Sequence, residues 1–304
     1  ELTGILSGRD RLVISPSRPW LLESLDLFVD HDFEQLEERG ITVKKTGTWD
    51  PRRAAEDLQS FEYQRMIRPI TYRGLDKRFI AYIPILIDGA RESLMRRISE
   101  QTPALLAARH CRAQSEEVPP LFCTTEVFEK CCVTGLDNSR GFPLGAAMTL
   151  FRSEREVRDL FSAFYGAAWS RSYRRTFHWF LRDSYPRFAE EWLGNEELIR
   201  AGGELLEWHL SPPVHSVQPR RGRTYEYSYD EAAEELRVGD ETYSISPETW
   251  SWGTGASHPQ LETWIRARDP ADIAFGRALP EFVAYLREAI KIEDEVKNLV
   301  LFAA

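Results

Sequence analysis

The sequence predicts an α+β fold, in which a central domain with a mixed β-sheet is followed by a helical part that carries a small β-hairpin insertion. Short runs of β-branched and aromatic residues alternate with turns between residues 65 and 152. From residue 153 onward apolar residues recur at helical spacing, except in a tyrosine-rich stretch at about residues 223–253. With 304 residues, 42% of them hydrophobic, the chain can bury a sizeable core.

Residues 1–64 predict an extended segment followed by a helix. The opening "TGILSGRDRLVIS" is punctuated by glycines, which is typical of extended chain. Pro19 then begins a helical stretch that ends at Gly40, because proline is favoured in the first turn and glycine just past the last. We expect residues 1–64 to form a segment of their own ahead of the central domain.

Residues 65–152 predict the mixed sheet. The expected strands are "RFIAYIPILI", "PLFCTT" and "KCCVTGL", and the turns between them include "YRGLDK" and "GLDNSRGFP". A short helix is expected at "ARESLMRRI", which would place Arg91, Arg96 and Arg97 along one end of it. We therefore expect the arginines of this region to lie close to its strands.

Residues 153–304 predict a helical part. Val157, Leu160, Phe161, Phe164 and Tyr165 follow the i, i+3, i+4, i+7, i+8 pattern of a helix. Further helices are expected from about residue 171 to 183, at "EELIRAGGELLEWHL" with a soft break at its two glycines, at "HPQLETWIRARD" and at "LPEFVAYLREAIKIEDEVKNLVLF". Antiparallel strands with "VGDE" as a turn are expected between them.

Charge is distributed unevenly along the chain. Residues 65–187 contain 20 Lys and Arg against 13 Asp and Glu, a net +7, whereas the whole chain has a formal net charge of -9. The remaining residues therefore carry 19 basic against 35 acidic side chains, a net -16. A basic centre between acidic flanks is typical of a module that faces a polyanion.

The common catalytic and metal-binding fingerprints are missing from the sequence. There is no GxGxxG, P-loop, HExxH, GxSxG or NPPY motif, so we expect no catalytic residues. The four cysteines lack paired CxxC spacing, and Pro212 and Pro213 prevent His209 and His215 from sharing a helical face, so we expect no metal site. Reduced thiols and the lack of an apolar run near 18 residues predict a cytoplasmic protein without a membrane span.

The stretch "SRSYRRTFHWFLRDSYPRF", residues 170–188, interleaves arginines with aromatic residues. At helical spacing Tyr173, Phe177, Phe180 and Leu181 form one stripe, which we expect to lie in the core. The arginines then occupy other faces. They either contact phosphate or form an ordinary solvated surface.

Several blocks, in order along nearly the whole chain, resemble the C-terminal specificity region of Type ISP restriction-modification enzymes. "IRPITYRGLDKRF" is similar to the family's "YRPFDxR" block, and "ARESLMRRI" to the "RxxVMRH" block that follows it. "TGILSGRDRLVI", "GFPLGAAM", the stretch at residues 170–188, "GGELLEWHL" and "ETWSWGTGASHPQLETWIRAR" resemble further blocks.

The resemblance implies that the chain reads the DNA target of a restriction-modification system that defends against phage. Residues 1–64 would lead in from a preceding methyltransferase domain, residues 65–152 would be the α/β target-recognition core, and residues 153–304 the helical C-terminal part. Double-stranded DNA and the methyltransferase domain of the parent polypeptide are the implied partners. S-adenosylmethionine, ATP and magnesium are expected only in that parent enzyme.

Basic side chains would fix the phosphates, and a few loop residues would read base edges in the major groove. The candidate DNA-binding residues are Arg73, Lys77, Arg78, Arg91, Arg96, Arg97, Arg109, Arg112, Lys130, Arg140, Arg171, Arg174 and Arg175. We assign Arg174 and Arg175 to phosphates, and Arg109, Arg112 and Arg140 to base edges.

Two alternatives stay open. Arg73 and Arg78 flank Asp76, so this pair of arginines can also be structural ion-pair partners. The chain as a whole can also be an acidic interaction scaffold that docks catalytic domains or another protein without touching DNA.

Overall fold

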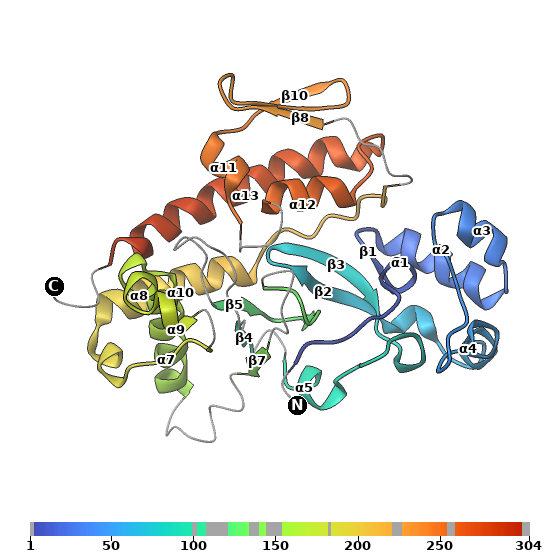
Figure 1. Cartoon of the computed structure of the whole chain (residues 1–304), viewed down its shortest axis with the longest axis horizontal. Helices are drawn as coiled ribbons and strands as arrows, with labels where there is room; N and C mark the ends of the chain where they lie inside the picture. Colours follow the sequence, from blue (N-terminus) through green and yellow to red (C-terminus); the bar gives the residue numbers. More distant parts are fainter. Residues whose placement is uncertain are drawn as a thin grey trace.

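The computed structural model describes residues 3–98, 102–107, 121–133, 140–143, 154–181, 184–220, 227–253 and 259–299. Two small sheets occupy the middle of the molecule, with the N-terminal helices on one side and α7 to α10 on the other (Figure 1). The two last helices cover the top of this body, and a third sheet stands beyond them. The arrangement confirms the predicted α+β class.

The N-terminal region is helical and is interrupted where the sequence predicts one continuous helix. Its elements are α1 (Asp10–Val13), β1 (Ile14–Ser15), α2 (Arg18–Val29), α3 (Phe33–Glu38) and α4 (Pro51–Leu58). The helix expected from Pro19 to Gly40 breaks because His31 takes a left-handed conformation with φ of 61°. Asp32 then caps α3 by accepting a hydrogen bond from the Gln35 backbone N–H at 3.1 Å.

The first central sheet combines segments from both sides of residue 65. Its strands, in the order β1-β3-β2-β6, are β1, β3 (Asp76–Ala81), β2 (Ile67–Arg73) and β6 (Val127–Phe128). The β2–β3 hairpin turns at Gly74, whose φ of +51° is a conformation that glycine adopts without strain. β1 pairs antiparallel with β3 and β6 pairs parallel with β2, so the sheet is mixed, as predicted.

The second central sheet is antiparallel, with the order β5-β4-β7. It is formed by β4 (Ala104–Ala107), β5 (Leu121–Thr124) and β7 (Arg140–Pro143). Two predicted strands differ from the structure: the strand in "RFIAYIPILI" ends at Ala81, and Lys130–Val133 of "KCCVTGL" forms a turn. Along the chain, the short helix η1 (Tyr63–Met66) precedes β2, and η2 (Pro84–Leu86) and α5 (Glu92–Met95) lie between β3 and β4.

Two long helices, α7 (Glu154–Trp169) and α10 (Glu196–Leu210), cross at very short range. A Cβ placed on Gly202 would lie 2.1 Å from the Ser162 carbonyl oxygen and 2.8 Å from the Gly166 nitrogen. The soft break expected at Gly202 and Gly203 is therefore wrong, because α10 continues through both residues. Gly202 is needed for the close approach of α7.

The arginine- and aromatic-rich stretch folds as two short helices, α8 (Arg171–Thr176) and α9 (His178–Leu181), where the sequence predicts one. Tyr173 and Leu181 are buried as expected, in a small apolar cluster with Trp192 of η3 (Glu190–Gly194). Phe177 and Phe180, also expected in the core, are only half-buried, and Trp179, which lies outside the stripe, has 76% of its surface exposed.

The C-terminal region contains a sheet of three antiparallel strands, one more than a hairpin: β8 (Tyr227–Asp230), β9 (Glu235–Val238) and β10 (Glu241–Ser244). The "VGDE" turn is confirmed, since Gly239 has a φ of +58° between β9 and β10. The helices α11 (Pro247–Ser251), α12 (Gln260–Ala267) and α13 (Ile273–Lys297) follow. One apolar core runs from Ile5 to Val296, and buried residues of the N-terminal region, among them Leu21, Phe28 and Leu58, pack into it together with the central sheets.

Candidate nucleic-acid interface

Three of the predicted DNA-binding residues lie on the β2–β3 hairpin, and all three are engaged inside the protein. Arg73 Nη1 lies 2.6 Å from Glu129 Oε2 and also donates to the Tyr72 carbonyl at 2.7 Å. Arg78 Nη2 lies 2.7 Å from Asp76 Oδ2. Lys77 is buried, and its Nζ donates to the Leu210 carbonyl at 3.0 Å. The structure therefore supports the alternative that Arg73 and Arg78 are ion-pair partners inside the protein.

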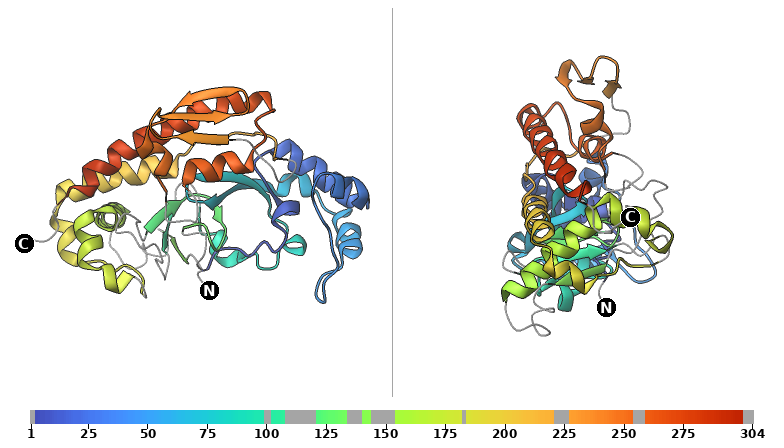
Figure 2. Two further views of the ribbon diagram at one scale, coloured as in Figure 1. Left: turned by 45° about the horizontal axis from the view of Figure 1, so that its top comes forward. Right: turned by 90° about the vertical axis from the view of Figure 1, so that its left-hand side faces the viewer.

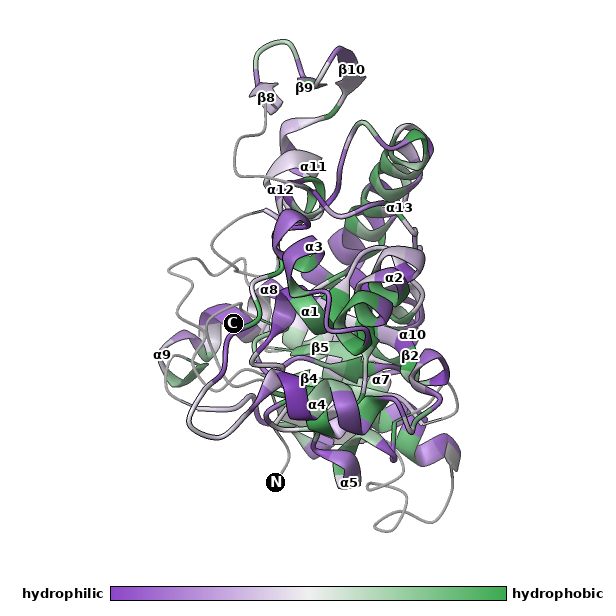
Figure 3. Ribbon diagram, turned by 90° about the vertical axis from the view of Figure 1, so that its right-hand side faces the viewer, coloured by the Kyte–Doolittle hydropathy of each residue, from purple (hydrophilic) through white to green (hydrophobic). Residues whose placement is uncertain are grey.

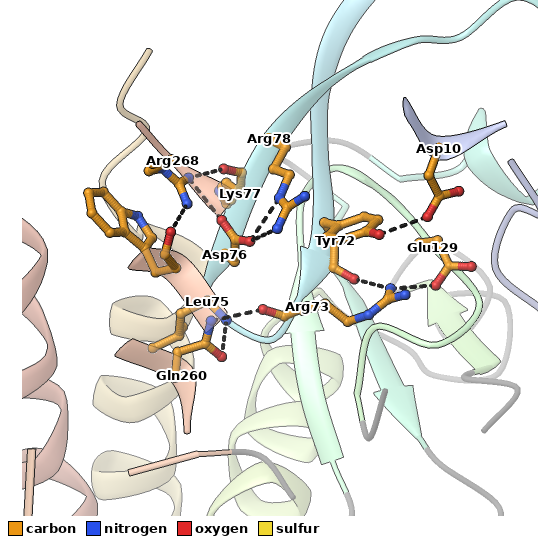
Figure 4. Close-up of polar contacts among 11 residues, drawn as sticks. Asp10, Tyr72, Arg73, Leu75, Asp76, Lys77, Arg78, Glu129, Gln260 and Arg268 are labelled. Atoms are coloured by element: carbon orange, nitrogen blue, oxygen red, sulfur yellow. Dashed lines mark hydrogen bonds and ion pairs between the residues drawn. The ribbon is translucent and has the colours of Figure 1, made fainter. Parts of the chain in front are cut away.

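Asp76 joins this hairpin to the C-terminal helices (Figure 4). Its side chain is fully buried, and Oδ1 accepts a hydrogen bond from Arg268 Nη2 at 2.9 Å. Burial raises the pKa of Asp76, but the Arg78 and Arg268 guanidiniums outweigh burial and hold the pKa below its ordinary value. Asp76 is therefore charged between two cations.

Arg268 and Gln260 complete the junction. Burial lowers the pKa of Arg268 to about 10 and Asp76 opposes that change, so the guanidinium stays charged at neutral pH. The Gln260 side chain accepts from the Leu75 backbone N–H at 3.3 Å and donates to the Arg73 carbonyl at 3.0 Å. The "YRGLDKR" block thus binds α12 to the sheet through the Asp76 side chain and through its backbone at Arg73 and Leu75.

Arg174, which the sequence assigns to a phosphate, is not placed for that contact. Its side chain is buried, with 2% of its surface exposed, and Nε donates to the Ser170 carbonyl at 3.3 Å. Tyr173 and Arg174 are neighbours on α8 that point in different directions, and both are buried, so α8 is covered on more than one face. Arg175 is exposed, and Arg171 donates to Asn298 Oδ1 at 3.4 Å.

Four other predicted residues lie at or near the surface around α5, and we call them the basic end: Arg91, Arg96, Arg97 and Lys130. Arg91 precedes α5 with a φ of 52°, and Arg96 and Arg97 follow the helix and are exposed. Arg96 also pairs with Glu92 at 2.6 Å across one turn. Because surface pairs of this kind contribute little, Arg96 can exchange that partner for a phosphate.

The N-terminal segment brings Lys130 close to α5. Leu6 exchanges two backbone hydrogen bonds with Gly89, each 3.0 Å long, and the Lys130 N–H donates to the Ile5 carbonyl at 3.0 Å. Residues 5 and 6 therefore lie between the two halves of the basic end. The helix α8 lies elsewhere, beside the end of α13, so the structure does not bring Arg171 and Arg175 to the basic end (Figures 1 and 2).

The predicted base-reading residues fall mostly outside the part of the chain that the structure describes. Arg109 and Arg112 lie outside the described residues, and Arg140 is described for its backbone alone. Arg140 pairs with Ala107 where β7 meets β4. This places its backbone on an outer strand of the second central sheet.

Sequence reasoning missed most of the acidic and distant partners of these arginines. Glu129 and Arg268 carried no sequence signal, since each meets its partner only after the chain has folded. Arg11, Arg39, Arg220 and Arg266 were missed as well, although they line one cavity with Arg78. The available signal was their residue type, because 33 of the 39 basic residues are arginine.

The described residues contain no group of three or more His, Cys, Asp or Glu side chains placed to hold a metal ion. None of their helices combines the length and the apolar character needed to cross a bilayer.

Comparison with solved structures finds a similar fold in three proteins. The chain matches a nuclease-deletion mutant of the Type ISP restriction-modification enzyme LlaGI in complex with a DNA substrate mimic, with 14% identity and a TM-score of 0.64 over 98% of this chain and 27% of that one. It matches the ATP-dependent Type ISP enzyme LlaBIII bound to DNA with 14% identity and a TM-score of 0.66, over 98% and 23% of the two chains. A DrdV–DNA complex matches with 15% identity and a TM-score of 0.65, over 100% and 36%.

The chain thus spans between 23% and 36% of the length of these three proteins. Among curated protein sequences no significant match was found. The model of the Type ISP C-terminal specificity domain matches residues 1–149, which include the N-terminal helices, both central sheets and the basic end. Over these residues the chain is thus similar to the Type ISP C-terminal specificity domain, in agreement with the sequence resemblance.

Proposed function

We propose that this chain recognises the DNA target of a Type ISP-like restriction-modification enzyme. The observation that carries the proposal is the basic end, where Arg91, Arg96, Arg97 and Lys130 gather within a match to a specificity-domain family. The similarity of the fold to three proteins in complex with DNA or a DNA mimic supports it. Double-stranded DNA is the proposed partner.

In this proposal the surface arginines of the basic end position the duplex by contacting phosphates. Such contacts fix the register of the protein on DNA and carry no sequence information themselves. Arg109, Arg112 and Arg140 are the proposed base readers, because a guanidinium can donate two hydrogen bonds to guanine O6 and N7. Arg73, Lys77, Arg78 and Arg174 are no longer part of the proposed interface, since internal contacts engage or bury them.

We also propose that this chain performs no catalysis. Methyl transfer, DNA cleavage and ATP hydrolysis would belong to other parts of a parent enzyme, with S-adenosylmethionine, ATP and magnesium bound there. This agrees with a chain that spans only part of the enzymes it resembles. The methyltransferase domain is then the proposed protein partner.

The test is the salt dependence of duplex binding, measured by fluorescence anisotropy on the 304-residue chain. Each phosphate contact contributes roughly 0.9 to the slope of log K against log salt. Replacing both Arg96 and Arg97 with Ala should lower the affinity for all duplexes alike and flatten the slope by up to about two units. The control replaces Arg52 and Arg53, two exposed arginines of α4, with Ala.

The control should leave both the affinity and the slope near the wild-type values. Binding that is equal at about 50 and about 200 mM salt contradicts phosphate contacts as its source. If the two double variants weaken binding equally, the basic end is not the interface and only general electrostatic attraction remains.

A second candidate function is protein docking, and the three-stranded sheet favours it. Residues 227–248 contain seven Asp and Glu against one Arg, and they would repel DNA. This sheet and α5 lie at opposite ends of the molecule (Figures 1 and 3). The docking function is the correct one if the chain binds no duplex even at low salt but does bind a basic protein surface of the parent enzyme.

A further inference from the structure

Arg68 lies on β2 and differs from the other two arginines of the β2–β3 hairpin. Arg73 pairs with Glu129 at 2.6 Å, and Arg78 pairs with Asp76 at 2.7 Å. Arg68 forms no ion pair in the described structure, and its Nε is enclosed without a hydrogen-bond partner. It is therefore the one arginine of this hairpin that the described fold leaves without an acidic partner.

Tyr82 holds the Arg68 guanidinium in place. The central carbon of the guanidinium lies 3.7 Å from the centre of the Tyr82 ring. The ring is itself fixed, because Tyr82 is buried, its hydroxyl donates to the Ala90 carbonyl, and its backbone N–H donates to the Met66 carbonyl at 3.0 Å. Stacking uses the face of a guanidinium and leaves the N–H donors in its plane available. A side chain that is already ordered loses little conformational entropy when it binds a ligand.

The stacked pair lies beside the basic end. Ala90, which accepts the hydrogen bond from Tyr82, is two residues before the start of α5. Burial raises the pKa of Tyr82, Glu92 of α5 adds to that change, and Arg96 opposes it. Both charged residues are thus close to the ring on which Arg68 stacks. Arg68 therefore adjoins the surface that we propose for the duplex.

The charge of Arg68 is only partly compensated inside the protein. Burial lowers the pKa of Arg68, and Tyr82, Glu126 and Glu92 oppose this change without cancelling it. The side chain is half-buried, so it has already lost part of its hydration. Acceptors on a ligand would replace the hydrogen bonds to water that burial has removed.

The edge of a guanine base supplies a matching pair of acceptors. Guanine O6 and N7 in the major groove accept two hydrogen bonds from the planar fork of one guanidinium. Because Nε is enclosed, the donors left for this pair are on Nη1 and Nη2, at the end of the Arg68 side chain. A different base would leave this partly buried charge unpaired, which is how a fixed polar group discriminates between ligands. The exposed Arg96 and Arg97 are better suited to phosphates, which carry no sequence information.

We propose that Arg68 reads a guanine of the DNA target in the major groove. The inference rests on the proposed function and names a residue that determines its sequence specificity. It concerns a described side chain with a fixed orientation, in addition to the base readers Arg109, Arg112 and Arg140.

The test selects bound duplexes from a randomised library with the 304-residue chain and sequences them. The variant is Arg68→Lys, which keeps the positive charge but lacks the planar fork. The wild type should enrich a G·C pair at one position, and the variant should lower that enrichment by about tenfold at this position alone. The matched control is Arg96→Lys, the same substitution at an exposed arginine, and it should keep the base preferences of the wild type.

A modified duplex ties the residue to one atom of the base. Deazaguanine, in which carbon replaces N7, is placed at the enriched position. It should weaken binding of the wild type and have little further effect on Arg68→Lys, because the variant has already lost that hydrogen bond. Thermal melting checks that each variant is folded. If the lysine variant is not, Arg68→Met takes its place, since it keeps an unbranched stem over the Tyr82 ring.

The outcomes separate this inference from the proposed function. A folded Arg68 variant with the base preferences of the wild type overturns the inference, and so does a loss of affinity that is equal for all sequences. Both results leave DNA recognition by the rest of the chain intact. A wild-type chain that binds no duplex even at low salt overturns the proposed function itself.

Discussion

Asp76 on β3 and Arg268 at the end of α12 form a buried ion pair of 2.9 Å across 192 positions of sequence. Both side chains are essentially unexposed, and Arg78 pairs with the other oxygen of the same carboxylate. Residues of the central sheet and of the C-terminal helices are thereby held by one carboxylate. The contact links the segment that matches the specificity domain to the rest of the chain.

Replacing Asp76 with Asn should lower the free energy of unfolding by about 3–5 kcal/mol, because removal of one partner leaves buried charge without compensation. Urea unfolding measures the effect. Asp57→Asn on the exposed face of α4 is the control and should change stability by less than about 0.5 kcal/mol. Equal stability of the two variants would show that Asp76 contributes no more than a surface carboxylate.

The buried ion pairs of Asp76 also predict that the stability of the fold depends on pH. Its pKa lies below the ordinary value of 3.8, so it is charged in the folded chain at pH values where it is protonated in the unfolded chain. It therefore stabilises the fold above pH 3.8, and the contribution is lost as the pH falls through the lower pKa of the folded state. Asp76→Asn should lose less stability than the wild type over that acid range, whereas parallel curves would contradict the assignment.

The crossing of α7 and α10 predicts opposite effects for two neighbouring glycines. Gly202→Ala would place a Cβ 2.1 Å from the Ser162 carbonyl oxygen, and separating the helices should cost about 1–3 kcal/mol or more. Gly203→Ala meets only the Ser162 side chain, at 3.2 Å from its hydroxyl, which can rotate away. That variant should be near neutral, because alanine favours a helix interior by roughly 0.5–1 kcal/mol over glycine. Melting temperatures that fall equally in both variants would contradict the close crossing.

Replacement of Arg174 should lower the stability of the fold, whereas replacement of Arg175 should not. Arg174→Ala empties a buried site and should cost about 2–5 kcal/mol of stability. Arg175→Ala removes an exposed side chain and should leave urea unfolding within about 0.5 kcal/mol of the wild type. If the two variants unfold at the same urea concentration, the burial of Arg174 is not important for the fold.

Thiol labelling provides a fifth test of the fold. Burial raises the pKa of Cys123 to about 12, and the side chain is fully enclosed, so its reactive thiolate form is scarce at pH 8. Iodoacetamide should label the half-buried Cys131 in the native chain and leave Cys123 unmodified, as read by peptide mass spectrometry. In urea both should react, which serves as the control. Rapid native labelling of Cys123 would mean that the β5 region opens readily.

The sequence alone predicted the features that depend on near neighbours. The apolar spacing from Val157 to Tyr165 predicted α7, and glycine in "VGDE" predicted the turn between β9 and β10. Asp76 between Arg73 and Arg78 was enough to raise a structural role for both arginines. Such features follow from the periods of helix and strand and from the φ that glycine permits, and these are local properties.

Tertiary structure decided the contacts between distant residues. Helical spacing placed Arg174 away from the aromatic stripe, but α8 is covered on more than one face and Arg174 is buried. Gly202 was a possible helix break until α7 packed against it, and Arg268 became the partner of Asp76 only across 192 residues. Spacing along the chain tells which side chains share a face, whereas burial and charge pairing depend on which other element covers that face.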